Sequence, residues 1–404
     1  MSAARTRVRD ALLRLTNPRL MWQVSRRRDR PIKRILVVRP DHLGDLLFAT
    51  PALRRIREAF PDAHVTGLVG PWGRAMWHSN PDLDELKVLR FPGMAGGREG
   101  GLLAPYWLLR QEASNLEHQA YDLGMALRFD HWWGAALMSA ARIPHRWGYD
   151  TPGLGEWLTN AVPYTPGRHE VEQNLALVEA VLQRMGATHA TPLQIDRAKG
   201  IPGLRPPPGE QPDPSTTTGW LDANRRVVIH PGTMSANKLW TIEGWAEVAS
   251  KLASEGWSVA LTGSPQEKPL ADAIASKIRN TQYAIRNLTG LTTNLSQLAW
   301  VLAQAHFVLG VDSGPLHIAD ALGKPTLHLY GPSDEDTWGP WGDPRKHRAF
   351  RAPGTRPTGR LEVGSNALEG GPEMRAIIPE MVLPEVEALK GEVQAQERGS
   401  RDEI

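Results

Sequence analysis

Short apolar runs alternate along the chain with longer stretches in which apolar residues recur every three or four positions. The runs are typical of buried parallel strands, and the stretches are typical of amphipathic helices. In the first half we predict strands at 34–39, 64–69 and 121–127, with a helix from 45 to about 60. In the second half we predict strands at 226–230, 257–262, 307–311 and 325–330 and helices at 241–255, 267–279, 295–305 and 314–322. Alternating strands and helices indicate an α/β protein with two Rossmann-like halves.

A proline-rich segment separates the two halves. Six prolines lie between residues 202 and 214, and Ser215 and three threonines follow them. This composition is typical of a linker, which we place at 201–224. We therefore expect one domain at 33–200, a second at 225–345 and a C-terminal segment at 346–404.

Composition excludes several classes of protein. The 404 residues include no cysteine, so a disulfide-stapled fold, a cysteine-ligated zinc site and a thiol nucleophile are impossible. The net charge of +3 is uneven, because residues 1–34 hold eleven basic and two acidic side chains and so carry +9. An arm of basic and apolar residues at 1–32 suits either attachment to an anionic membrane or plain solvation, and both alternatives stay open.

In the first half, the predicted loop after the first strand carries two carboxylates, Asp41 and Asp45. Either one could cap the following helix, because a carboxylate satisfies free N–H groups at a helix N-terminus. Alternatively, one of them acts as a general base, with Gly44 allowing close approach of a substrate. The spacing does not choose between these two interpretations.

In the second half, three loops at the carboxyl ends of strands have chemistry suited to anions. Residues 230–240 are polar and contain Lys238, and residues 311–317 place Ser-Gly-Pro at a strand-to-helix turn. In the loop 261–267, Glu267 either accepts from ribose hydroxyls or favours the first turn of its helix. Three such loops together indicate a pocket for a nucleoside diphosphate.

Several common enzyme signatures are missing. Neither opening strand leads into G-x-G-x-x-G, and the chain has no G-x-x-x-x-G-K-[ST], H-E-x-x-H or G-x-S-x-G motif. A nicotinamide dehydrogenase, a P-loop enzyme, a zinc protease and a serine hydrolase are therefore disfavoured.

Motifs spread over residues 33 to 340 resemble those of glycosyltransferase family 9, the heptosyltransferases that build the inner core of lipopolysaccharide. The matching motifs are Arg39-x-Asp41-x-x-Gly44-Asp45, Thr50-Pro51-Ala52-Leu53, His230-Pro231-Gly232, Lys238-Leu239-Trp240, Asp312-Ser313-Gly314-Pro315-Leu316-His317 and Tyr330-Gly331-Pro332. The resemblance implies a GT-B fold, in which two Rossmann-like domains with parallel sheets face each other across a cleft. The domain at 33–200 would bind the acceptor, and the domain at 225–345 would bind the nucleotide sugar. A helix near the C-terminus would return to the first domain.

The resemblance also implies a role for individual residues. Asp45 would be the catalytic base, and Lys238 would stabilise the departing diphosphate. The residues that would bind the donor are Thr233, Lys238, Glu267, Asp312, Ser313, Gly314 and His317. On the acceptor side the candidates are Arg39, Asp41 and Gly44. Neither a metal nor a cofactor is implied.

The resemblance leads us to expect an inverting glycosyltransferase that moves a heptose from ADP-heptose to a lipopolysaccharide core or another envelope glycan. We expect it in the cytoplasm, at the inner face of the membrane if residues 5–34 bind anionic lipid, and we expect no nucleic-acid partner. Two alternatives remain, namely a nucleotide-sugar epimerase of the same fold and a catalytically silent protein that binds glycans or nucleotide sugars.

Overall fold

The computed structural model describes residues 31–94, 103–187, 205–278, 285–362 and 368–402. The basic arm therefore lies outside the described residues, apart from its last two positions. Within the described residues, contacts separate the chain into two compact units at about residue 195, and the short segment Gly167–His169 is grouped with the second unit. We refer to them as the first and second units.

The first unit is built on a six-stranded sheet in the order β3-β2-β1-β4-β5-β6. Every neighbouring pair of strands is parallel. The strands are β1 (Arg34–Arg39), β2 (His64–Val69), β3 (Glu85–Val88), β4 (Leu123–Ala126), β5 (His145–Tyr149) and β6 (Asn160–Val162). This order is that of a Rossmann sheet, as the sequence predicts.

The helix predicted from 45 to about 60 is in fact two helices. α2 (Leu43–Phe48) ends at Ala49, where α3 (Thr50–Ala59) begins. Pro51 stands in the first turn of α3, and proline suits that position because the amide that it lacks has no helical partner there. The other helices of this unit are α4 (Arg74–Trp77), α5 (Ala104–Glu117), α6 (Trp132–Ala140) and α7 (Glu170–Met185).

The second unit repeats the same plan. Its sheet has the order β12-β11-β10-β7-β8-β9, again with every pair parallel. The strands are β7 (Arg226–His230), β8 (Ser258–Leu261), β9 (Ile285–Asn287), β10 (Phe307–Val311), β11 (Thr326–Tyr330) and β12 (His347–Arg351). The helices are α8 (Pro214–Thr217), α9 (Ile242–Ser254), α10 (Lys268–Lys277), α11 (Leu295–Gln304), α12 (Gly314–Ala321), α13 (Glu335–Trp338), α14 (Pro372–Arg375) and α15 (Pro379–Asp402).

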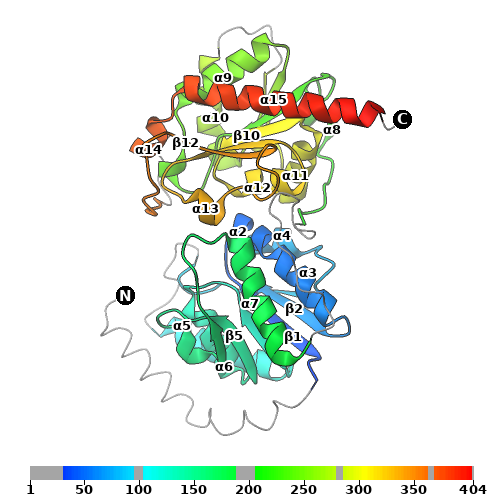
Figure 1. Ribbon diagram of the computed structural model, residues 1–404, viewed down its shortest axis with the longest axis vertical. Helices are drawn as coiled ribbons and strands as arrows, with labels where there is room; N and C mark the ends of the chain where they lie inside the picture. The colour runs from blue at the N-terminus through cyan, green and yellow to red at the C-terminus, as the bar shows by residue number, and fades with distance from the viewer. Residues whose placement is uncertain (1–30, 95–102, 188–204, 279–284, 363–367, 403–404) are drawn as a thin grey trace. The chain divides into compact units, whose positions relative to one another are not determined.

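The C-terminal helix α15 packs on the second sheet and completes its core (Figure 1). Val382, Val386, Leu389 and Val393 lie on one face of the helix, and all four are buried in the same cluster as the strands of this sheet. The apolar stripe of this helix is therefore used within the second unit, and its return to the first domain stays a prediction. None of the helices in the described ranges is long and apolar enough to cross a membrane.

Candidate active site

In each sheet, the strand order reverses between two neighbouring strands, β1 and β4 in the first and β7 and β10 in the second. Loops that leave such neighbours diverge, and open α/β sheets bind ligands in the space between them. The loops that carry the sequence-predicted residues follow β1 in the first unit and β7, β8 and β10 in the second. Both sets therefore lie at the carboxyl edge of their own sheet.

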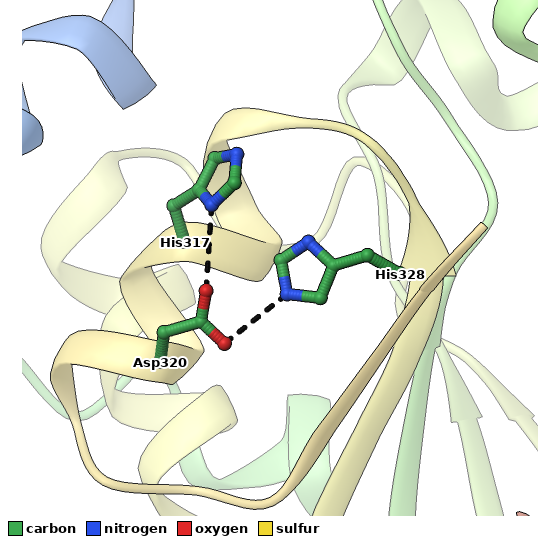
Figure 2. A group of neighbouring side chains, drawn as sticks. All are labelled: His317, Asp320 and His328. Atoms are coloured by element: carbon green, nitrogen blue, oxygen red, sulfur yellow. Dashed lines mark hydrogen bonds and ion pairs between the residues drawn. The ribbon is translucent and has the colours of Figure 1, made fainter. Parts of the chain in front are cut away.

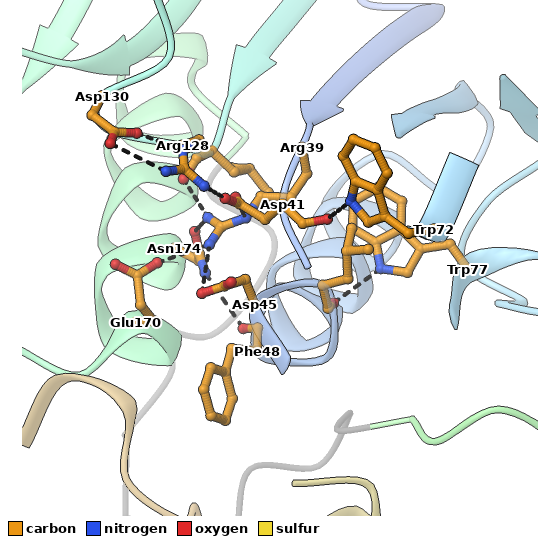
Figure 3. A network of polar contacts seen from close by, with 12 residues as sticks. Arg39, Asp41, Asp45, Phe48, Trp72, Trp77, Arg128, Asp130, Glu170 and Asn174 are labelled. Carbon is orange, nitrogen blue, oxygen red and sulfur yellow. Dashed lines mark hydrogen bonds and ion pairs between the residues drawn. The ribbon is translucent and has the colours of Figure 1, made fainter. Parts of the chain in front are cut away.

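Arg39 organises the polar cluster of the first unit (Figure 3). Its guanidinium is 2 % exposed, and it lies at the end of β1. It donates to Asn174 Oδ1 and forms an ion pair with Glu170 Oε2, each at 3.0 Å, and it also donates to the carbonyl oxygen of Leu127. Glu170 and Asn174 stand one turn apart on α7, so one face of that helix fixes the guanidinium.

Asp41 is the buried counterion of two arginines. Its carboxylate lies 2.5 Å from Arg39 Nε and accepts a hydrogen bond from Arg128, which in turn is held by Asp130. Burial alone would raise the pKa of Asp41, but Arg39 and Arg128 outweigh it and hold the pKa below its ordinary value. Asp41 is therefore ionised and held between two arginines, which suits a structural role rather than proton transfer.

Asp45 lies in the first turn of α2 and differs from Asp41 in both exposure and charge environment. Its side chain is 25 % exposed, and the nearest arginine nitrogen, Arg39 Nη2, is 3.8 Å from Oδ1. Burial of the carboxyl group and the negative charge of Asp41 raise the pKa of Asp45 to about 6. The N-cap of α2 is His42, and no side chain makes a capping hydrogen bond there. Of the two carboxylates, Asp45 has the exposure and the raised pKa that a general base needs, and this role stays a prediction.

Sequence reasoning missed three partners in this cluster, namely Arg128, Glu170 and Asn174. Arg128 comes directly after a strand that the sequence predicts, so it could have been recognised as a residue at the carboxyl edge of the sheet. Glu170 and Asn174 lie on α7, which was not predicted, and they contact Arg39 across more than 130 residues of chain.

In the second unit, three of the sequence-predicted residues contact one another. Lys238 Nζ lies 2.6 Å from Asp312 Oδ2, and His317 Nε2 lies 3.4 Å from Asp312 Oδ1. Burial alone would raise the pKa of Asp312, but Lys238 and His317 hold it far below its ordinary value. This carboxylate orients Lys238, whose ammonium has three donors and so keeps others for a ligand.

The turn into α12 has the features of a phosphate site. Ser313 is the N-cap and Gly314 the first helical residue, so the N–H groups of Ser313 and Gly314 lie at this helix end, whereas Pro315 has no N–H and Leu316 donates to the carbonyl oxygen of Ser313. The Oγ of Ser313 is buried and has no hydrogen-bond partner among the described residues. Thr233, which is half-buried, lies in the loop after the neighbouring strand β7.

Glu267 is a capping residue in the structure. Its Oε2 accepts from the backbone N–H of Ser264 at 2.6 Å, completing a capping box. A Cβ built on Gly232 would lie only 2.0 Å from Glu267 Oε1, so the glycine lets the loop after β7 approach this carboxylate. The helix-favouring interpretation of Glu267 is thus realised, and its contact with ribose stays a prediction.

His317 also belongs to a buried group with Asp320 and His328 (Figure 2). One nitrogen or oxygen of each residue lies within 4.8 Å of the others, a spacing that a metal ion could use. However, Asp320 already engages both rings, His317 Nδ1 at 3.3 Å and His328 Nε2 at 3.1 Å. The metal-free site expected from the resemblance stays a prediction.

The chain contains two Rossmann-like units, and each has polar side chains at the point where its strand order reverses. These features define an α/β enzyme with the GT-B fold of glycosyltransferases. The comparisons with known proteins identify the family of this enzyme. The family model described as "Glycosyltransferase family 9 (heptosyltransferase)" matches residues 109–355. The chain therefore belongs to glycosyltransferase family 9, and the resemblance found in the sequence is confirmed.

Similar proteins match over most of the chain. Lipopolysaccharide heptosyltransferase 2 of Salmonella typhimurium is 25 % identical over 380 residues, which cover 89 % of this chain and 99 % of that protein. The solved structure of E. coli ADP-heptose LPS heptosyltransferase II has a TM-score of 0.65 at 22 % identity and covers 90 % of this chain and 99 % of its own. The structure of an E. coli heptosyltransferase with ADP has a TM-score of 0.61 at 23 % identity, with coverages of 88 % and 99 %. These structures confirm the GT-B fold.

Proposed function

We propose that this protein transfers a heptose from ADP-heptose to a lipopolysaccharide core acceptor, with inversion at the anomeric carbon and without a metal ion. Family membership and the names of the similar proteins support the sugar, the nucleotide and the acceptor class. The observation that carries the proposal is Asp45, a partly exposed carboxylate with a pKa of about 6 at the carboxyl edge of the first sheet.

In the proposed reaction Asp45 is the general base. An acceptor hydroxyl attacks the anomeric carbon of the donor, its proton passes to Asp45, and the bond from that carbon to the diphosphate breaks. A carboxyl group with a pKa near 6 is mostly ionised at pH 7.5, yet it is more basic than an ordinary aspartate. Arg39 Nη2, at 3.8 Å, holds the carboxylate in place without neutralising it in a close ion pair.

The residues of the second unit would bind the donor and stabilise the departing ADP. Lys238 supplies a positive charge that Asp312 fixes at 2.6 Å. The first-turn N–H groups at Ser313 and Gly314 supply donors for phosphate oxygens, and they need no metal ion to do so. In this assignment Thr233 contacts phosphate, Glu267 the ribose, and His317 acts through Asp312.

On the acceptor side, the side chains of Arg39 and Asp41 are each only 2 % exposed. They would therefore hold the site in its conformation without touching the acceptor. Gly44 precedes Asp45 in α2 and leaves the approach to the base free of a side chain. In the same assignment, the domain at 33–200 binds the acceptor and the domain at 225–345 binds the donor.

The decisive experiment is a donor screen with mass detection of the product, run in EDTA with a truncated lipopolysaccharide core as acceptor. We expect transfer from ADP-heptose that survives the chelator. Conversion of the donor without acceptor would instead support an epimerase, and donor binding without turnover across the panel would support a silent binding protein. The family and the transferases named above do not favour either alternative.

We also propose that the enzyme acts at the cytoplasmic face of the membrane, held by the basic arm. Residues 1–34 carry a charge of +9, which would attract anionic lipid and weaken as salt screens it. Co-sedimentation with anionic liposomes should be strong for the full chain and weak for a chain beginning at Pro31. Equal binding by both would contradict the proposal.

A further inference from the structure

A buried carboxylate on α12, Asp320, gathers polar groups from three elements. It is 6 % exposed. Its Oδ1 accepts from Thr326 Oγ1 at 2.5 Å and lies 3.1 Å from His328 Nε2 and 3.2 Å from His347 Nδ1. Its Oδ2 lies 3.3 Å from His317 Nδ1, so Asp320 connects β11 and β12 to the helix that opens at the proposed phosphate site.

His317 stands between two carboxylates. Nδ1 faces Asp320 and Nε2 faces Asp312 at 3.4 Å. A neutral imidazole has one N–H, so both contacts are hydrogen bonds only when the ring is an imidazolium cation. Burial opposes that charge, but hydrogen bonds and attraction to the two carboxylates raise the pKa of His317 to about 9.

The result is a row of four alternating charges: Lys238, Asp312, His317 and Asp320. The four charges sum to zero, so the row is electrically neutral without a bound ion. A divalent cation bound to the same atoms would displace the proton of His317 and leave an excess positive charge in a buried place. The balance therefore favours a hydrogen-bonded network over a metal site.

Other polar groups also lie around His317 and Asp320. His328 of β11 lies 5.0 Å away between ring centroids, and burial lowers its pKa, so it is neutral at pH 7. His347 of β12 faces Asp320, and Tyr330 of β11 donates to the carbonyl oxygen of Trp338. The other two elements packed on α12 are α11 and β10, and neither has a titratable residue.

We propose that Asp320 is a positioning residue of the donor site: it holds His317 as a cation, which fixes Asp312 and, through Asp312, the ammonium of Lys238. This role rests on the proposed function, because it assumes that Lys238 meets the donor diphosphate. Without the charge of Asp320, His317 gives up its proton at a lower pH than in the wild type. A neutral ring attracts Asp312 less strongly than a cation does, so Asp312 is drawn toward Lys238 and the ammonium is drawn away from the ligand.

The test compares Asp320→Asn with the wild type from pH 6 to pH 9, measuring kcat and the KM for ADP-heptose. The substitution keeps the size of the side chain and removes its charge. The ratio of variant to wild-type kcat/KM should be highest at pH 6, where the largest fraction of His317 is protonated in the variant. It should fall below about one tenth at pH 8.5, because without the charge of Asp320 the pKa of His317 lies lower than in the wild type, although Asp312 still favours the charged ring.

Asp272→Asn is the matched control. Asp272 is 53 % exposed on α10, where it pairs with Lys268, and its variant should follow the wild type at every pH. A merely structural role for Asp320 would lower activity by the same factor at every pH, and such a constant ratio would overturn the proposal. A stoichiometric transition metal in the purified wild type would overturn it as well.

A second measurement needs neither Asp320→Asn nor activity. The ring signal of His317 in the full-length wild type, assigned by its loss in His317→Gln, should titrate near pH 9 in a proton NMR series. Titration at or below pH 7 would overturn the proposal. If His317 titrates near pH 9 but the wild type transfers no sugar, the proposed function fails while the charge row stands.

Discussion

Replacing Asp45 with asparagine tests the core of the proposed mechanism. The substitution keeps the size of the side chain and one acceptor oxygen, so the contact with Arg39 can persist, but it removes the base. At pH 7.5 a carboxyl group with a pKa of about 6 is about 97 % ionised, so the wild type is almost fully active there. Loss of a general base costs about 10²- to 10⁴-fold in rate, or about 3 to 5 kcal/mol of transition-state stabilisation.

The pH profile of the wild type gives the sign of the effect. The base must be deprotonated, so kcat/KM should be level between about pH 7 and pH 8 and fall about tenfold for each pH unit well below pH 6. Asp45→Asn should lose this acidic limb together with its activity. Both quantities follow from initial rates of ADP release, measured in a three-component buffer of constant ionic strength.

Two results would refute the reasoning about Asp45. One is a variant that keeps more than a tenth of the wild-type rate at pH 7.5, and the other is an acidic limb that survives in Asp45→Asn. Because Asp45 is partly exposed and Arg39 keeps its ion pair with Glu170, the free energy of unfolding should change by no more than about 1 kcal/mol. Asp62→Asn, at an exposed position of the same unit, serves as the control and should match the wild type in both respects.

Three further substitutions probe the second unit. Lys238→Met should lower kcat at saturating ADP-heptose by about 10²- to 10³-fold, and a change confined to KM would contradict its role on the leaving group. Gly232→Ala should raise the KM for the donor, because its Cβ would lie 2.0 Å from Glu267 Oε1, whereas Gly391→Ala, with open space around it, should leave KM unchanged. Leu389→Ala should lower the free energy of unfolding in guanidinium chloride by about 2 to 5 kcal/mol, and a smaller change would mean that α15 is not part of the core.

The central strands of both sheets could be predicted because their sequences are almost wholly apolar. β1 and β10, for example, are buried along nearly their whole length. A parallel strand that is buried on both faces has no polar side, so its apolar residues form a continuous run in the sequence. The strands at the sheet edges were missed for the opposite reason. β3 and β9 have three or four residues each, include charged side chains and are only partly buried, so no local pattern marks them.

Only those residues of the site that lie in short continuous segments of the sequence could be predicted. Asp45 and Lys238 lie in short polar loops directly after buried strands, and these loops are visible in the sequence. The partners that set their properties are distant along the chain. Asp312 is 74 residues from Lys238, and Glu170 is 131 residues from Arg39, so charge balance at the site is a property of the fold.

The place of α15 has a consequence for how such an enzyme can diverge. Since its apolar stripe covers the second sheet, the core of the donor-binding half under our proposal is closed by a segment of that same half. Substitutions that reshape the first sheet for a new acceptor therefore leave the apolar stripe of this helix in its place against the second sheet. Selection for a different acceptor glycan can act on one half of the protein while the packing beneath the nucleotide-sugar loops stays as it is.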